Sequence, residues 1–267
     1  MAEVKSEIRA GAGIIFFANP DGGFLTSEMV DSAIEKFDIL RADENVRSII
    51  FTGALPEVFI RHFSVEEIIA MSSALRENNK AGVAPERFAL SPLRAFWEKV
   101  DNCPKPTIAA INGVCGGGGC ELALACDIRL AAKGTYTIGQ MEILVGILPG
   151  AGGTVRLSRL VGPGKAMEYI LRGKTFYPDE ALECGLVNQV VAGDVLEAAL
   201  IMASEFDDKP PRALAAIKQA VKASWGKNTL EGVLEEGDLF ADLIATDDQA
   251  LKMMDEYVSN GHSFKKI

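Results

Sequence analysis

Two isolated carboxylates, Glu121 and Glu142, are the side chains whose type and surroundings best suit chemistry. Each stands among apolar residues, Glu121 in the run CELALAC and Glu142 in the run MEILVG. A buried carboxylate costs free energy and is rarely idle, and two of them can divide the work of general acid and general base. The plain alternative for Glu121, in the first turn of an expected helix, is a surface residue that complements the helix dipole.

Each carboxylate lies near a glycine-rich turn. Four consecutive glycines, residues 116–119, precede Glu121, and the sequence GAGG at residues 150–153 follows Glu142. Glycines let a ligand oxygen approach the unpaired N–H groups of a helix N-terminus, although a tight strand-to-helix connection uses them equally well. Their spacing does not match the dinucleotide-binding fingerprint. The pattern indicates acid/base catalysis beside an anion-stabilising backbone site.

The elements that position these residues alternate between strands and helices in the first half of the chain. Apolar runs predict strands at residues 13–18, 46–52 and 107–111. Helical periodicity predicts a helix that begins near Thr26 or Ser27, and further helices at residues 66–75 and 92–100, with a loop at residues 78–82. Strands separated by helices imply parallel βαβ units with helices on the faces of the sheet.

The second half is expected to be mostly helical after one more pair of strands. Residues 128–132 and 135–139 predict a hairpin around the Lys133-Gly134 turn. Helices are expected at residues 165–171, 178–184, 194–206, 211–224 and 230–244. We therefore expect an α/β core with the active site over residues 1–200 and a helical C-terminal region over residues 201–267.

Composition excludes several classes of function. The chain has 27 Lys and Arg against 37 Asp and Glu, a net charge of −10, which argues against a nucleic-acid partner. No apolar stretch is long enough to span a membrane, and residues 1–10 do not form a signal peptide. The five cysteines lack zinc-ligand spacing, so we expect buried fillers and no metal site. A soluble, cytoplasmic protein follows from these expectations.

Residues 108–128, IAAINGVCGGGGCELALACDI, resemble the signature of the crotonase (enoyl-CoA hydratase/isomerase) superfamily along their whole length. Other family segments are similar to GIIFFANPDGGFLTSEM, VRSIIFTG, ILPGAGGTVRLSRLVG, ALECGLVNQVV and ATDDQALKMMDEYVSNGHSFKK. The resemblance implies an α/β fold, a spiral of ββα units with a C-terminal helical trimerisation region, in a homotrimer or homohexamer. The apolar residues of the helix expected at 230–244 agree with such an assembly, because one core would struggle to cover them.

The resemblance also assigns roles to residues. It implies an enzyme that binds acyl-CoA and stabilises a thioester enolate with the backbone N–H groups of Phe63 and Gly118. Glu121 would deprotonate water for attack at Cβ, and Glu142 would deliver a proton to Cα. Coenzyme A would enter as part of the substrate, with no separate cofactor. Contacts to the substrate are expected from Arg61, Phe63, Ser64, Gly117, Gly118 and Lys265.

Three departures from the family pattern bear on the substrate. Arg61, His62, Phe63 and Ser64 replace small residues, and Met141 replaces a proline before Glu142. The stretch between Ser64 and Pro104 is longer than usual in a region that covers the acyl group. Phe63 can still donate its N–H group, and we expect His62 to point away from the thioester oxygen and Arg61 to reach a CoA phosphate.

The reaction itself stays open between several alternatives. The presence of both Glu121 and Glu142 favours hydration of 2-enoyl-CoA to 3-hydroxyacyl-CoA. Isomerisation, hydrolysis or decarboxylation on the same scaffold are alternatives, as is a catalytically silent homologue that serves binding or assembly. His62 has either a catalytic or CoA-contacting role or a structural one, and structural salt bridges are expected from Arg156 and Arg159.

Overall fold

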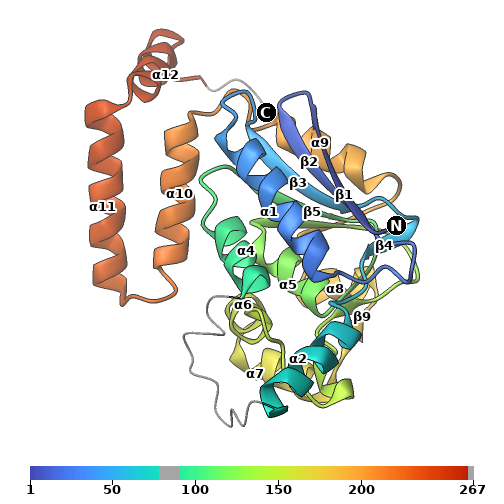
Figure 1. The fold of residues 1–267 in the computed structure, drawn as a ribbon. Helices are drawn as coiled ribbons and strands as arrows, with labels where there is room; N and C mark the ends of the chain where they lie inside the picture. The colour runs from blue at the N-terminus through green and yellow to red at the C-terminus, as the bar shows by residue number, and fades with distance from the viewer. Residues whose placement is uncertain (78–90, 264–267) are drawn as a thin grey trace.

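A twisted sheet of six strands forms the centre of the molecule in the computed structural model, which describes residues 1–77 and 91–263 (Figure 1). Its order is β1-β2-β3-β5-β7-β10, with β1 antiparallel to β2 and all other neighbours parallel. The strands are β1 (Glu3–Arg9), β2 (Ala12–Ala18), β3 (Ser48–Gly53), β5 (Thr107–Ile111), β7 (Ile128–Ala132) and β10 (Gln189–Val191). The expected parallel units are therefore confirmed, while the loop expected at residues 78–82 lies outside the described residues.

Both faces of this sheet are covered by helices, as its apolar strands require. Alternate residues of β2, β3 and β5 enter a core with α1 (Ser27–Ala42), α4 (Pro92–Asp101) and α5 (Gly118–Ala125) on one face. The intervening residues pack against α9 (Val195–Ser204) on the other face. Helix α5, which carries Glu121, is buried along its whole length, so its side chains are fixed by packing.

A second, smaller sheet holds the segments nearest the expected chemistry. Its order is β4-β6-β8-β9, with strands β4 (Glu57–Ile60), β6 (Gly113–Gly116), β8 (Ile138–Gly139) and β9 (Thr175–Phe176). The hairpin expected after Asp127 is wrong. Residues 128–132 remain in the main sheet beside β5 and β10, whereas Ile138 and Gly139 pair with β6 and β9 in the second sheet.

Capping side chains set the helix starts in the first half. Thr26 accepts a hydrogen bond from Met29 N at the start of α1, and Ser91 accepts one from Arg94 N at the start of α4. Ser64 does the same for α2 (Val65–Glu77), because its hydroxyl accepts a hydrogen bond from Glu67 N at 3.2 Å. The chain between β8 and β10 contains η1 (Glu142–Val145), α6 (Gly153–Val161), α7 (Pro163–Arg172) and α8 (Pro178–Glu183).

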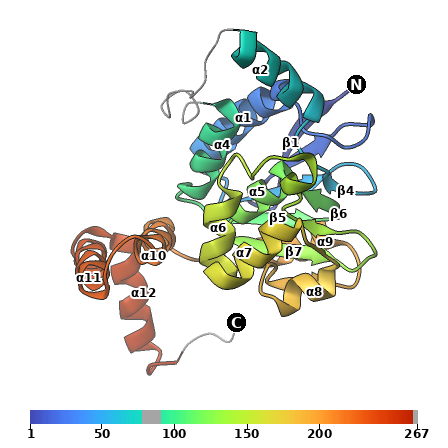
Figure 2. The same ribbon diagram turned by 90° about the horizontal axis from the view of Figure 1, so that it is seen from below.

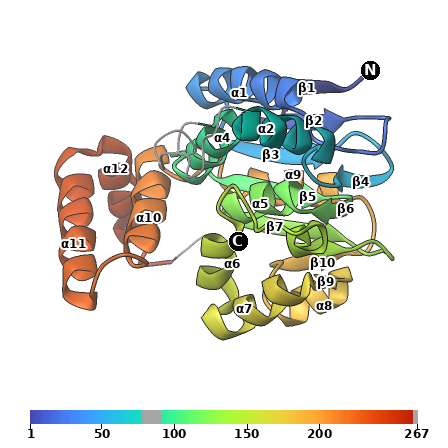
Figure 3. The same ribbon diagram turned by 60° about the horizontal axis from the view of Figure 1, so that its bottom comes forward.

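The C-terminal helices stand to one side of this α/β body in all three views (Figures 1, 2 and 3). They are α10 (Pro211–Ala223), α11 (Thr229–Thr246) and α12 (Asp248–Ser259). Two lysines of α10 tie them to the body, since Lys218 pairs with Asp127 at 2.5 Å and Lys222 with Asp101 at 2.8 Å. The division of the chain at residue 200 stays a prediction.

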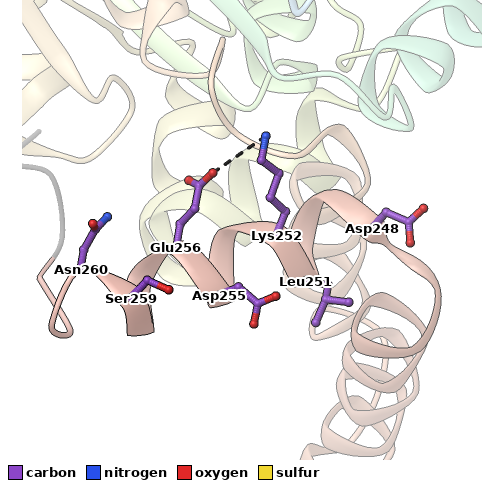
Figure 4. Close-up of a pocket in the computed structure, with 7 residues that line it drawn as sticks. All are labelled: Asp248, Leu251, Lys252, Asp255, Glu256, Ser259 and Asn260. Carbon is purple, nitrogen blue, oxygen red and sulfur yellow. Dashed lines mark ion pairs between the residues drawn. The ribbon is translucent and has the colours of Figure 1, made fainter.

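A shallow hollow on the outside of α12 is lined by residues of that single helix and its end (Figure 4). It contains three carboxylates, and Lys252 pairs with one of them, Glu256, at 3.9 Å. Because all of these residues belong to one helix and its end, the hollow does not enclose a ligand. Within residues 1–77 and 91–263, no helix combines the length and the apolar character needed to cross a bilayer.

Candidate active site

The four glycines at residues 116–119 lie against the end of β4 and the segment that follows it. A Cβ on Gly116 would lie 2.5 Å from Arg61 O, and one on Gly119 would lie 2.4 Å from Ile60 O. Gly117 has φ of +46°, in the left-handed region that favours glycine. The absence of side chains is therefore needed for two backbones to meet, and both uses that the sequence left open are present: a tight connection and a bare backbone surface.

Two backbone N–H groups are brought together at this crossing. A Cβ built on Gly118 would lie only 3.5 Å from Phe63 N, without a clash. The neighbouring amides of Arg61, Ser64 and Gly117 all donate to backbone carbonyls. Within the described part of the chain, no acceptor is recorded for the N–H groups of Phe63 or Gly118. The site thus offers two adjacent donors, one of them at the N-terminus of α5.

Glu121 projects from the first turn of α5 to the N-terminus of the neighbouring helix α6. Its Oε1 accepts hydrogen bonds from Ala151 N at 2.7 Å and Gly153 N at 2.9 Å, and the residue is 2% exposed. Burial raises the pKa of Glu121 above its ordinary value, although these two N–H groups and the charges of Arg156 and Arg94 favour the carboxylate. The alternative of a surface residue is therefore wrong.

Glu142 begins the short helix η1 and reaches the same glycines from the other side. Its Oε1 lies 3.4 Å from the position of a Cβ on Gly117. Burial, together with the nearby negative charge of Glu121, raises the pKa of Glu142 to about 7. The structure thus gathers both carboxylates and the bare backbone in one region, and a pKa of about 7 lets Glu142 hold a proton near neutral pH.

Gln140 lies between the two carboxylates. Its amide is 2.7 Å from Glu142 Oε1 and 3.1 Å from Oε2 when the nitrogen faces the carboxylate. A Cβ on Gly153 would lie 2.8 Å from the same amide, so Gln140 also packs against the turn that binds Glu121. Because an amide has a donor end and an acceptor end, Gln140 can bond Glu142 in either protonation state. The sequence offers no signal for this contact.

The residues that depart from the family pattern are accommodated without backbone strain. His62 is absent from the described non-glycine residues with positive φ, and its ring lies 4.7 Å from that of Phe24. Its Nδ1 is 2.8 Å from Phe63 O. These contacts give His62 a packing role.

The expected substrate contacts differ in what else they do. Arg61 is exposed, and its Nε donates to Gly22 O at 2.8 Å, so part of its side chain is committed to the turn after β2. Ser64 is buried as the cap of α2. Gly117 lies between His62 and Glu142. Lys265 lies outside the described residues.

The described residues contain no set of side chains suited to bind a metal ion. No group of three His, Cys, Asp or Glu side chains that could hold an ion occurs in residues 1–77 and 91–263. All five cysteines are free, and four of them are buried. The groups that the described residues bring together at this site are two carboxylates, an amide and two N–H donors.

The chain is similar in sequence to known proteins over most of its length. The sequence profile described as "Enoyl-CoA hydratase/isomerase" matches residues 7–266. "Probable enoyl-CoA hydratase echA8" of Mycobacterium leprae is 36% identical over 240 residues, covering 89% of this chain and 88% of that protein. The short-chain-enoyl-CoA hydratase of Clostridium acetobutylicum is 35% identical over 208 residues, covering 78% of this chain and 76% of that protein.

Solved structures extend the agreement to three dimensions. Enoyl-CoA hydratase subunit I from Geobacillus kaustophilus superimposes with a TM-score of 0.83 at 31% identity, covering 99% of this chain and 97% of that one. An enoyl-CoA hydratase from Thermoplasma volcanium gives the same TM-score at 29% identity, covering 95% and 96% of the two chains. The expected crotonase-like α/β fold is confirmed, and the chain belongs to the enoyl-CoA hydratase/isomerase family.

Proposed function

We propose that this protein hydrates a 2-enoyl-CoA to the 3-hydroxyacyl-CoA. The observation that carries the proposal is the pairing of two N–H groups, on Phe63 and Gly118, that have no acceptor among the described residues with two buried carboxylates. Two neighbouring carboxylates can divide the work of general base and general acid. The relatives named as enoyl-CoA hydratases support the same reaction.

The surroundings of the two carboxylates support a division of roles. Glu121 Oε1 accepts hydrogen bonds from two N–H groups at the turn that begins α6, and such hydrogen bonds favour the ionised form of a base. Ionised Glu121 takes a proton from water as the hydroxyl adds to Cβ. Glu142, with a pKa of about 7, holds a proton near neutral pH and delivers it to Cα. The thioester oxygen gains negative charge as the enolate forms, and the N–H groups of Phe63 and Gly118 stabilise that charge.

Substrate, assembly and location complete the proposal. Coenzyme A enters as part of the substrate with no separate cofactor, and Arg61 and Lys265 are proposed contacts for its phosphates. A homotrimer or homohexamer is supported by exposed apolar residues on the outlying helices and the turn between α10 and α11, among them Trp225, Leu230, Leu234 and Phe240. A cytoplasmic location stays a prediction of the sequence.

The assay that tests the proposal follows the loss of ultraviolet absorbance of crotonyl-CoA. It compares the wild type with two glycine variants, one whose new methyl group fits and one whose methyl group clashes with the backbone. In Gly118→Ala the new methyl group meets Phe63 only at van der Waals distance, so the protein should fold, but the methyl occupies space beside both donors. We expect kcat to fall by about 10² or more with an unchanged melting temperature.

Gly119→Ala is the contrasting variant. Its Cβ would lie 2.4 Å from Ile60 O, so this change should lower the melting temperature, which Gly118→Ala should not. The wild type should convert crotonyl-CoA and water to 3-hydroxybutyryl-CoA, so that the double bond between Cα and Cβ is lost together with the absorbance. A wild type that only shifts the double bond or cleaves the thioester, or that binds acyl-CoA without turnover, would overturn the proposal. So would a Gly118→Ala variant with full activity.

A further inference from the structure

The turn at residues 150–153 is held on both of its sides by charged groups. Its N–H groups, those of Ala151 and Gly153, donate to Glu121 Oε1. Its carbonyl groups point to two arginines. Arg94 donates to Gly150 O at 2.8 and 3.1 Å through Nη2 and Nε, and Arg156 donates to Ala151 O at 2.9 Å through Nη1. The peptide groups of the turn therefore lie between cations and the carboxylate of the proposed base.

Arg156 is anchored by an acidic partner. Its side chain is 10% exposed, and its Nε donates to Asp101 Oδ2 at 2.9 Å. Asp101 is in turn paired with Lys222 of α10. Burial opposes ionisation of Asp101, yet the ion pairs with Lys222 and Arg156 hold its pKa below the ordinary value. The guanidinium thus has a fixed, ionised partner at the end of α4.

The turn is shaped to fit this guanidinium. Gly152 has φ of +102°, and a Cβ there would lie 2.2 Å from Arg156 Nη1. Any side chain at residue 152 would displace the arginine from Ala151 O. Glycine is thus required both for the turn and for the approach of the cation.

We propose that Arg156, together with Arg94, is a positioning residue for Glu121: by clamping the carbonyl groups of the turn, it aims the Ala151 and Gly153 N–H groups at the carboxylate and keeps Glu121 ionised. Because this inference rests on the proposed role of Glu121 as base, its test needs a readout that is independent of turnover. Arg156 need not touch substrate for this role.

The charges that face Glu121 make the direction of the effect definite. Arg156 from α6 and Arg94 from α4 favour the ionised form, while burial and the Glu142 carboxylate beside η1 oppose it. Removal of Arg156 takes away one cation and loosens two hydrogen bonds to the carboxylate. Both changes raise the pKa of Glu121, and an opposite charge at close range typically lowers a carboxyl pKa by about 1–3 units.

The experiment compares Arg156→Met with Arg159→Met in the full-length protein. Arg159 lies on the same helix and is exposed, with its guanidinium 5.4 Å from the Trp225 ring, so its loss removes the same charge away from the turn. We expect the acidic limb of kcat/KM for crotonyl-CoA to move upward by about one pH unit in Arg156→Met and to stay in place in Arg159→Met. Arg156→Lys, which keeps the charge and loses the fork, should lie between them.

Carbon-13 NMR titration of glutamate-labelled protein provides the second readout, with the Glu121 signal assigned by its absence from Glu121→Gln. The Glu121 pKa should rise by the same amount in Arg156→Met, whether or not the wild type hydrates crotonyl-CoA. A merely structural Arg156 would lower the melting temperature and leave both the limb and the NMR pKa unchanged, which would overturn the inference. A wild type without hydratase activity but with the NMR shift would refute the proposed function alone.

Discussion

A buried ionisable side chain lies near each end of α5, and the two side chains differ in how many hydrogen bonds they form. Near the N-terminus, Glu121 has two hydrogen bonds on one oxygen, and no described residue donates to its Oε2. Beyond the C-terminus, Arg129 donates to four acceptors, Leu186 O, Ala123 O, Cys126 O and Asn188 Oδ1. Glu121 thus keeps one carboxylate oxygen without a donor among the described residues, whereas the guanidinium group of Arg129 forms hydrogen bonds that stabilise the fold.

This difference separates a proposed catalytic charge from a structural one on a single helix. Arg129 is 6% exposed and satisfies carbonyl groups at the negative end of α5, where a cation is favoured. Glu121 is also buried, but it lies near a second carboxylate and near two N–H groups that have no acceptor within residues 1–77 and 91–263. Burial alone therefore does not distinguish the two roles. The number of hydrogen-bonding atoms at each site that lack a partner among the described residues does distinguish them.

The largest effect is expected from Glu121→Gln, which tests the N-terminal end. Loss of a general base typically lowers kcat by about 10²–10⁴, equivalent to about 3–5 kcal/mol in the barrier. The free energy of unfolding should not fall near neutral pH, because ionised Glu121 is disfavoured by burial. Stopped-flow or steady-state hydration and chemical denaturation measure the two quantities. Glu168→Gln, an exposed change on α7, serves as the control, and equal activities of the two variants would contradict the assignment.

Arg129→Met should give the reverse pattern at the C-terminal end. Its loss leaves buried carbonyl groups of α5 and of Leu186 without donors, at about 1–3 kcal/mol for each unsatisfied group. We expect the free energy of unfolding to drop by about 3–5 kcal/mol, with kcat of the remaining folded protein changed less than about twofold. Arg172→Met removes an exposed partner of Glu168 and should cost at most about 1 kcal/mol. A folded Arg129→Met with normal stability would remove the contrast between the ends.

A smaller effect, graded with pH, is expected from Glu142. The proposed acid must be protonated, and its pKa is raised to about 7, so hydration should decline above pH 7 by about tenfold per unit. The same shift makes stability fall as pH rises from about 4.5 to about 7, because the folded state holds the proton more tightly than the unfolded state. Glu142→Gln should abolish the basic limb and flatten that stability slope. A basic limb that persists unchanged in Glu142→Gln would assign it to another group.

Much of the fold could be predicted because its central strands are buried on both sides. The strand expected at residues 107–111 matches β5, and the helix expected to begin near Thr26 or Ser27 starts at Ser27 with Thr26 as its cap. Strand β1 was not predicted, since only Val4 among its residues is buried and the strand depends on pairing with β2. Strands β8 and β9 have two residues each, too few for any periodic signal.

The site was predictable where residues are linked by short motifs and not where contacts cross the fold. Glu121, Glu142 and Gly118 lie in recognisable runs of glycine and apolar residues. Gln140 and Arg94 act through contacts that no local pattern encodes, because Arg94 reaches Gly150 from a different helix. Structural salt bridges were expected from both Arg156 and Arg159, but only Arg156 forms an ion pair among the described residues, while Arg159 lies over Trp225.

The crossing of the glycine run with the end of β4 has a consequence for how the family can diversify. The N–H groups of Phe63 and Gly118 come from segments separated in sequence by α2, α4, β5 and β6, and these segments are held together by the pairing of β6 with β4 and by the contacts of the glycine run with the end of β4. Lengthening a connection costs only about 0.6 kcal/mol per doubling of its length. Insertions between β4 and β6 are therefore thermodynamically cheap as long as these contacts remain, and the chain between the two strands can vary in length while the two N–H groups keep their positions.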